Sequence, residues 1–144
     1  MLKLSLLFCC ALFISQELVW SSDLDAAKKQ AQQENKMILL NFSGSDWCGP
    51  CIRLHKEIFS SGAFSAYAKD KLVLLNADFP RLKKNQLSKS RQLQNNKLAD
   101  EYNAGGAFPL TLLLDANGKI IKRWEGLPNE TPEAFVQELI SARQ

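Results

Sequence analysis

Blocks of apolar residues with two different spacings divide this chain into candidate strands and helices. The short runs 37–42 and 72–77 are almost wholly apolar, which is typical of strands that are buried on both faces of a sheet. Between them, Cys51, Leu54 and Ile58 recur at the spacing of one helix face. A strand, a helix and a second strand in this order predict a parallel unit with a right-handed crossover.

The elements around this unit follow from the same kind of pattern. Leu24, Ala27 and Ala31 share one face of a helix that is predicted to begin after Asp23 and to run to about residue 33. The other predicted elements are a helical turn around 64–67, a helix that ends near Tyr102, strands at 110–114 and 120–124 joined by a tight turn at 115–118, and a last helix from Thr131.

The first residues are typical of an export signal. Lys3 supplies a positive charge, and the apolar run 4–14 that follows it is too short to span a bilayer comfortably. Cleavage near Ser21 would leave a chain of single-domain size, so the sequence predicts a signal peptide over 1–21 and one domain over 22–144. An uncleaved membrane anchor is the alternative. The predicted location is the periplasm or another exported compartment.

Net charge and cysteine usage narrow the class of protein. A formal charge of +3 is too small an excess for a dedicated nucleic-acid binder, so no nucleic-acid partner is expected. Two of the four cysteines, Cys9 and Cys10, lie in the segment that we expect to be removed. An exported protein usually collects disulfides as a framework, yet only Cys48 and Cys51 would remain. This pair is therefore a candidate for reactivity.

The remaining pair stands in the pentapeptide Trp47-Cys48-Gly49-Pro50-Cys51, between a predicted strand and a predicted helix. Unpaired N–H groups and the helix dipole favour a thiolate at the first sulfur. Half of a zinc site is a competing interpretation, but such a site needs about four ligands and the chain has one histidine, His55. A structural staple over so short a loop would contribute little stability. The pattern therefore predicts dithiol redox chemistry without a metal.

Two motifs resemble those of the thioredoxin superfamily, and of its exported bacterial members in particular. They are the pentapeptide at 47–51 in its strand–helix–strand setting and Phe108-Pro109 directly before a predicted strand. The resemblance extends over nearly the whole chain after Asp23. It implies an α/β, thioredoxin-like fold with a central mixed sheet flanked by helices. It also implies that Pro109 is cis and that its loop packs beside the dithiol.

The resemblance gives each residue of the site a role. Cys48 is the attacking thiol, which forms a mixed disulfide with the substrate, and Cys51, expected to be less exposed, then releases the reduced substrate. Gly49 lets the substrate backbone approach, and Pro50 suits the first turn of a helix. Trp47 is either an apolar lip for the substrate or part of the core. The expected substrate-binding residues are Trp47, Gly49, Pro50, Phe108 and Pro109.

The sequence departs from the family's pattern at residues that would handle protons. Asn41 stands where the family usually has a buried Asp that helps the second thiol to lose its proton. Asp46, in a loop about one residue longer than thioredoxin's, either accepts that proton or is a solvated carboxylate. His55 follows the second cysteine by four residues and is either close to it or a distant surface imidazole.

The basic segment 81–97 is either a solvated face or a region that steers an acidic partner.

The predicted activity is exchange of protein disulfides in an exported compartment, as a reductant or an isomerase. Gly49-Pro50 is the dipeptide of thioredoxin and brings no positive charge between the thiols, which favours the reducing direction. The expected partners are protein disulfide substrates and a membrane-bound thiol electron donor. No cofactor is expected, and the protein is expected to be a monomer. The alternatives are a net oxidant that installs disulfides, and a binding or chaperone module whose thiols stay idle.

Overall fold

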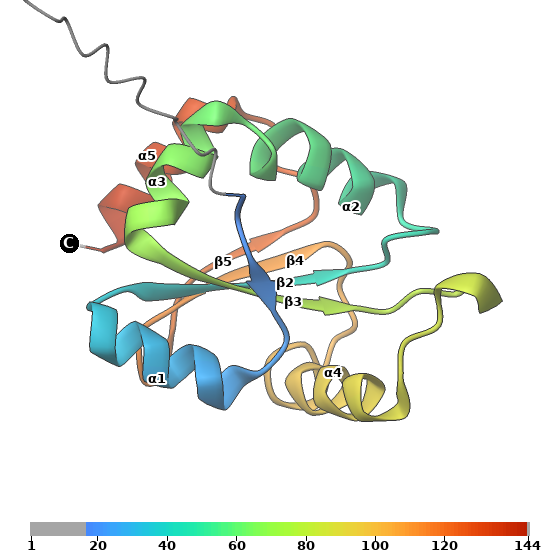
Figure 1. The fold of residues 1–144 in the computed structure, drawn as a ribbon. Helices are drawn as coiled ribbons and strands as arrows, with labels where there is room; N and C mark the ends of the chain where they lie inside the picture. Colours follow the sequence, from blue (N-terminus) through green and yellow to red (C-terminus); the bar gives the residue numbers. More distant parts are fainter. Residues whose placement is uncertain (1–16, 144) are drawn as a thin grey trace, which may run out of the picture.

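A five-stranded sheet forms the centre of the protein, and helices cover both of its faces (Figure 1). The computed structural model describes residues 17–143. The elements in chain order are β1 (Trp20–Ser21), α1 (Leu24–Glu34), β2 (Met37–Ser43), α2 (Gly49–Leu54), η1 (His55–Phe59), α3 (Gly62–Lys71), β3 (Leu72–Asp78), η2 (Lys83–Asn85), α4 (Lys89–Tyr102), β4 (Leu110–Leu114), β5 (Ile120–Glu125) and α5 (Pro132–Ala142). η1 is a turn of π-helix that continues α2, and η2 is a turn of 3-10 helix.

The sheet is mixed, as the sequence predicts, and its strand order is β1-β3-β2-β4-β5. β2 runs parallel to β3 and antiparallel to β4, which in turn pairs antiparallel with β5. The register places Asn41 of β2 beside Asn76 of β3 and beside Thr111 of β4. Three polar residues therefore meet across the three central strands, which are mostly apolar.

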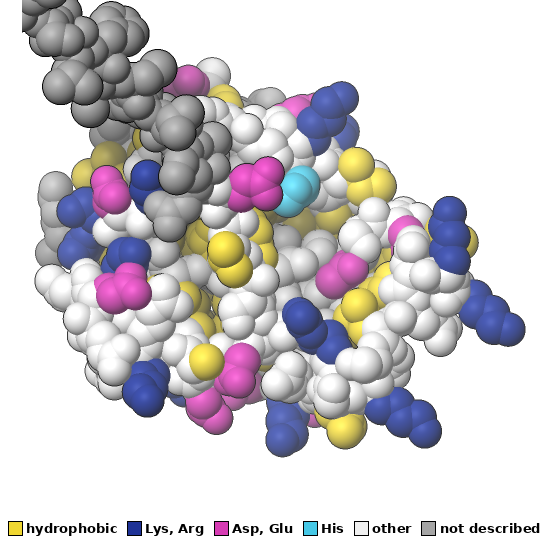
Figure 2. Space-filling view, in the orientation of Figure 1, with side chains coloured by type: hydrophobic (Ala, Val, Ile, Leu, Met, Phe, Trp, Pro, Cys, Tyr) yellow, Lys and Arg dark blue, Asp and Glu magenta, His cyan; other side chains and the backbone are white. Residues whose placement is uncertain are grey.

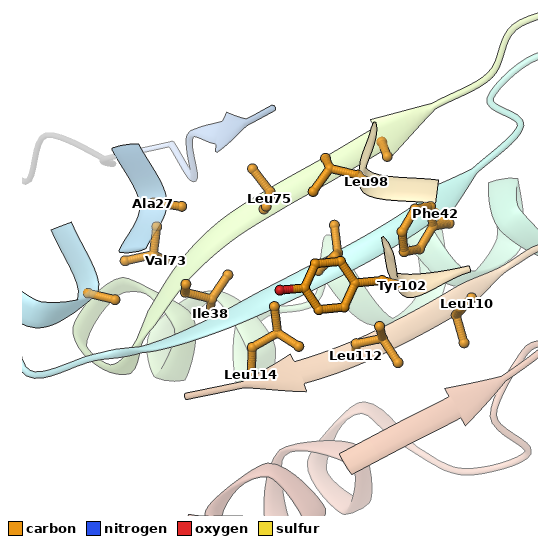
Figure 3. Packing of buried hydrophobic residues seen from close by; sticks show 13 residues of the cluster. Ala27, Ile38, Phe42, Val73, Leu75, Leu98, Tyr102, Leu110, Leu112 and Leu114 are labelled. Atoms are coloured by element: carbon orange, nitrogen blue, oxygen red, sulfur yellow. The ribbon is translucent and has the colours of Figure 1, made fainter. Parts of the chain in front are cut away.

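Alternate residues of the central strands face two separate apolar cores. Ile38 and Phe42 point to the side that α1 and α4 cover, where Tyr102 packs in the same cluster (Figure 3). Leu40 belongs to this cluster as well. Leu39 belongs to the second core, under η1, α3 and α5. Because helices bury both faces of β2, its sequence is a continuous apolar run and does not alternate with polar residues.

Side-chain caps set the starts of four helices. Asp23, Ser61, Ser88 and Thr131 each accept a hydrogen bond from the backbone N–H three residues further on, at 3.0–3.3 Å. A cap of this kind contributes about 1 kcal/mol to a helix. The predicted helices after Asp23 and at Thr131 therefore begin where the sequence analysis places them.

Two short elements are absent from the prediction. β1 pairs in parallel with β3 at the edge of the sheet, and the Trp20 ring packs against Phe59 with centroids 5.2 Å apart. η2 is a single turn between β3 and α4. Elements of two or three residues are too short to carry a periodic pattern of apolar positions, so the sequence contains no signal for them.

The structure describes only the last residues of the predicted signal peptide. Lys3 and the apolar run 4–14 lie outside the described residues. Trp20 and Ser21 belong to β1, so the folded sheet begins before residue 22, where the sequence analysis starts the domain. Among residues 17–143, no helix has the length and apolar character that crossing a membrane requires.

Candidate active site

The two cysteines of the pentapeptide form a disulfide at the N-terminus of α2. Cys48 is the N-cap residue, and its Sγ accepts a hydrogen bond from the backbone N–H of Cys51 at 3.3 Å. Gly49 and Pro50 occupy the first turn, where the missing N–H of proline costs no helix hydrogen bond. The first sulfur therefore lies where the helix dipole and an N–H group stabilise negative charge, in agreement with the sequence analysis.

The exposure of the two thiols differs from the expectation. Cys48 and Cys51 both expose 5% of their surface in this disulfide form. The bond between the sulfurs and the hydrogen bond from the Cys51 N–H hold the Cys48 side chain against the start of the helix. The assignment of Cys48 as the attacking thiol therefore depends on its position at the helix start and not on a larger exposed surface.

A second loop reaches the disulfide from a distant part of the chain. The peptide bond between Phe108 and Pro109 is cis, as the resemblance implies. β4 begins directly after it at Leu110, which pairs with Phe42 near the end of β2 that leads into the cysteine loop. The rings of Phe108 and Trp47 meet edge to face, with centroids 5.5 Å apart. The fold therefore brings the two motifs of the sequence analysis together.

Trp47 is half-buried and is held on several sides. Its Nε1 donates a hydrogen bond to the carbonyl oxygen of Phe79 at 2.8 Å. The backbone of Gly44 lies so close to the indole that a Cβ atom there would overlap it. The guanidinium of Arg81 lies over the ring, 3.6 Å from its centroid. Trp47 is therefore held in place next to Cys48, with its ring partly buried and partly accessible. Its role as a lip for the substrate stays a prediction.

Asp46 holds the segment after β3 against the cysteine loop. Its carboxylate accepts hydrogen bonds from the backbone N–H groups of Arg81 and Leu82, both at 2.9 Å, and from Asn85 Nδ2 at 3.0 Å. These bonds, that from Arg81 foremost, keep the pKa of Asp46 below its ordinary value. Such a carboxylate is a poor proton acceptor. Its visible role is structural, and the sequence analysis considered only a proton acceptor and a solvated carboxylate.

A line of polar side chains crosses the central strands. Asn41 accepts a hydrogen bond from Thr111 Oγ1 at 3.2 Å and donates one to Asn76 Oδ1 at 3.0 Å. Ser43 Oγ lies 3.3 Å from Asn76 Oδ1 and 3.2 Å from Asp78 Oδ1. Asn41 is only 7% exposed, so a neutral and hydrogen-bonded amide occupies the place of the family's buried carboxylate. An amide does not take up a proton in the range where proteins work.

Cys51 borders a cavity of ≈ 320 Å³ together with three residues of this polar line, Asn41, Ser43 and Asn76. Asn41 and Ser43 belong to its polar wall, Trp20 belongs to its apolar wall, and His55 also lines it. The imidazole, the single cyan side chain in Figure 2, lies at the edge of a hollow on this face. His55 is exposed, and it borders the same cavity as Cys51. Within residues 17–143, no three His, Cys, Asp or Glu side chains are grouped as metal ligands.

Residues 24–142 match the family described as a thioredoxin-like domain. The chain belongs to the thioredoxin-like family. The disulfide bond reductase DsbH of Chlamydia pneumoniae is 34% identical to it over 125 residues, which cover 87% of this chain and 72% of that protein. The thioredoxin-related protein DsbJ of the same organism is 30% identical over 117 residues, which cover 81% of this chain and 33% of that protein.

Solved structures agree with this placement. A DsbH oxidoreductase superposes with a TM-score of 0.78 at 33% identity, over 88% of this chain and 85% of that one. A thioredoxin from Thermus thermophilus superposes with a TM-score of 0.64 over 89% of this chain and 88% of that one. Its identity is 18%, so this likeness shows the fold alone. The thioredoxin-like fold is confirmed, and the protein is a thiol-disulfide oxidoreductase of this family with a Cys-x-x-Cys site.

The sequence analysis did not identify the partners of Asn41 in this thioredoxin-like protein. A signal for one of them was present, because MILLNF at 37–42 and LVLLNA at 72–77 each have a single polar residue at the fifth position. Parallel strands in register place these two asparagines side by side. The contacts of Asp46 with the segment after β3 had no such signal, because the sequence around a loop carboxylate does not indicate which distant N–H groups will donate hydrogen bonds to it.

Proposed function

We propose that this thioredoxin-like protein reduces or isomerises protein disulfides in an exported compartment through Cys48 and Cys51. The observation that carries the proposal is the disulfide at the start of α2, with Trp47 and the cis Phe108-Pro109 loop beside it. This arrangement offers a sulfur at a helix start together with an apolar wall for a peptide. The name of the 34% identical relative, a disulfide bond reductase, supports the reducing direction.

Reduction of a substrate proceeds in two exchange steps. The Cys48 thiolate of the dithiol form attacks one sulfur of the substrate disulfide, and the other substrate sulfur leaves as a thiolate that takes up a proton. Cys51 then loses its proton and attacks Cys48 Sγ. The Cys48–Cys51 disulfide forms, the second substrate sulfur leaves, and two electrons have passed from the protein to the substrate. In isomerisation, another thiol of the substrate displaces Cys48 and the protein stays reduced.

The protein must recover two electrons after each reduction. A second dithiol supplies them by attacking the Cys48–Cys51 disulfide in the reverse sequence of steps. A membrane-bound thiol electron donor fits this need, because an exported protein is separated from the pools that keep cytosolic thiols reduced.

The direction of electron flow follows from the residues between the thiols. Gly49 and Pro50 place no cation there to stabilise the Cys48 thiolate further, which leaves the dithiol a good reductant. We therefore expect a reduction potential near that of thioredoxin, about −270 mV, in equilibrium with glutathione. A value more positive than about −180 mV would instead favour a net oxidant.

Export is supported by Lys3 and the apolar run 4–14. Processing falls before Trp20 in this proposal, because Trp20 packs against Phe59 and β1 pairs with β3. Cleavage after Ser21 would remove this edge strand from the sheet.

Reduction of insulin by a thiol donor tests the catalytic proposal. The wild-type protein should accelerate it, and Cys48→Ser should abolish the acceleration while the thermal unfolding curve shows an intact fold. If neither protein reduces insulin and both suppress the aggregation of an unfolded chain equally, the protein is a binding module and the thiols are idle.

A further inference from the structure

A basic segment lies directly beside the disulfide site. Pro80 follows the end of β3, and the chain then passes through Arg81 into η2. The hydrogen bonds from Arg81, Leu82 and Asn85 to the Asp46 carboxylate attach this segment to the cysteine loop, one residue before Trp47. Its position relative to the thiols is therefore set by the fold.

Three cations of this segment form what we call the basic rim: Arg81, Lys83 and Lys84. All three are exposed, and in the described part of the chain none of them lies within 4.0 Å of a carboxylate. Four other cations of the surface do have such a partner. The Asp46 carboxylate contacts this segment through the backbone N–H groups of Arg81 and Leu82 and the side chain of Asn85, and it forms no ion pair with a cation of the basic rim.

The basic rim is connected to the substrate wall by direct contact. The Arg81 guanidinium lies over the Trp47 ring at 3.6 Å from its centroid, and Trp47 in turn contacts Phe108. Leu82, between the cations, exposes 48% of its surface. Lys and Arg side chains project from the side of the molecule where Figure 1 places η2 (Figure 2). A peptide that lies along Trp47 would therefore meet positive charge as soon as it left the disulfide.

We propose that the basic rim selects substrate disulfides that are flanked by acidic residues, Asp or Glu, in an otherwise peptide-like segment. The inference rests on the proposed function, because it concerns the substrate of the same site. Charge complementarity of this kind raises the rate of encounter and fixes the register of the bound chain. A nucleic-acid partner is not proposed, because the formal charge of the whole chain is only +3.

Disulfide-linked fluorogenic peptides with the same cysteines and three different flanks test the proposal. The flanking residues are Glu in one peptide, Gln in the second and Lys in the third. At low ionic strength the wild-type protein should use the Glu peptide about three- to tenfold better than the Gln peptide in kcat/KM, mainly through KM, because each exposed charge pair contributes little. The preference should fade as salt approaches 1 M.

The variant Lys83→Glu/Lys84→Glu should reverse the preference toward the Lys peptide. Lys69→Glu/Lys71→Glu is the matched control, because it changes the charge equally at two exposed positions before the start of β3, whereas the basic rim follows its end. The control should keep the wild-type preference. The milder Lys83→Gln/Lys84→Gln should reduce the preference without reversing it, and it serves if the charge reversal disturbs folding.

Equal use of the three peptides by the wild-type protein, or the same reversal in the control, would overturn the inference. The Gln peptide separates this failure from failure of the proposed function, since an active enzyme without charge preference still reduces it. If no peptide is reduced, the rim is tested without turnover. Versions of the peptides with serine in place of cysteine should shift the amide resonances of Lys83 and Lys84 only when Glu is present.

Discussion

Asn41 on β2 donates a side-chain hydrogen bond of 3.0 Å to Asn76 on β3, so two neutral amides meet at the centre of the parallel strands. Both line the cavity that Cys51 borders, and no Asp or Glu of the described residues lines it. In this family the first of these positions usually holds a carboxylate. Cys51 is 5% exposed, and burial without a charged partner makes a thiol harder to ionise. The second exchange step is therefore the step that this pair of amides should slow.

Asn41→Asp should speed resolution of the mixed disulfide near neutral pH, because a carboxylate in the cavity wall can accept the Cys51 proton. The same change should lower the free energy of unfolding by about 1–3 kcal/mol, since it replaces a satisfied buried amide with a carboxyl group. Stopped-flow single-turnover kinetics and urea unfolding measure the two effects. Asn95→Asp is the control, because Asn95 is also buried, at 1% exposed, but does not line the cavity. It should destabilise the protein without acceleration, and equal rates for wild type and Asn41→Asp would contradict the prediction.

Cys51→Ser should accumulate mixed disulfides with substrate, whereas Cys48→Ser should not. Only Cys48 is the N-cap residue of α2, where the helix dipole and the N–H of Cys51 favour its thiolate. Non-reducing gels with mass spectrometry detect the trapped complexes. Alkylation of the reduced protein at mildly acidic pH should modify Cys48 first, and preferential labelling of Cys51 would reverse the assignment.

Gly44→Ala should displace the Trp47 indole, because the new Cβ atom would overlap the ring. Overpacking of this kind costs about 1–3 kcal/mol. Activity should fall together with stability if Trp47 binds the substrate as we propose. Thermal unfolding and insulin reduction report the two effects. Gly105→Ala is the matched control, since a Cβ atom there meets nothing within 4 Å, and it should change stability by no more than about 0.5 kcal/mol. Equal behaviour of the two variants would show that Trp47 is free to move.

The contacts of Asp46 should be lost in acid. Hydrogen bonding, led by the bond from Arg81, lowers the pKa of Asp46 in the folded chain. A carboxyl whose folded pKa lies below its unfolded value, about 3.9, stabilises the fold above that value and loses this contribution as pH falls through the folded pKa. The amide resonances of Arg81 and Leu82 should therefore titrate below about pH 4. Asp46→Asn should remove this transition and raise KM more than it lowers kcat. If this variant instead slows resolution of the mixed disulfide, Asp46 accepts the proton of that step.

The exported form should begin between Gln16 and Trp20. Trp20 packs against Phe59, and β1 completes the edge of the sheet, so a chain that begins at Ser22 should be less stable than one that begins at Glu17, by about 1–2 kcal/mol of lost apolar burial. N-terminal sequencing of the protein from the cell envelope identifies the start. A retained Met1, or recovery from the cytoplasm, would refute the localisation.

The sequence by itself determined the features that depend on near neighbours in the chain. The cap at Cys48, the disulfide with Cys51 and the two central strands all follow from spacings of a few residues, because helix and strand periods and a three-residue cysteine separation are local. The resemblance added the cis bond before Pro109, which no local spacing requires. β1 and η2 were not predicted, because elements of two or three residues are too short to show a periodic pattern of apolar positions.

Only the tertiary structure decided which distant side chains share the site. Asn41 and Asn76 are 35 residues apart, and Asp46 and Arg81 are also 35 residues apart, so their contacts exist only once β2 and β3 pair and the loops at their ends come together. Whether Trp47 was lip or core depended likewise on Phe79, Arg81 and Phe108, which approach it from two other loops. A sequence lists the chemical groups that are present, but the packing of the sheet determines which of them form hydrogen bonds with one another. It also determines which groups, such as the cations of the basic rim, remain exposed near the cysteine loop.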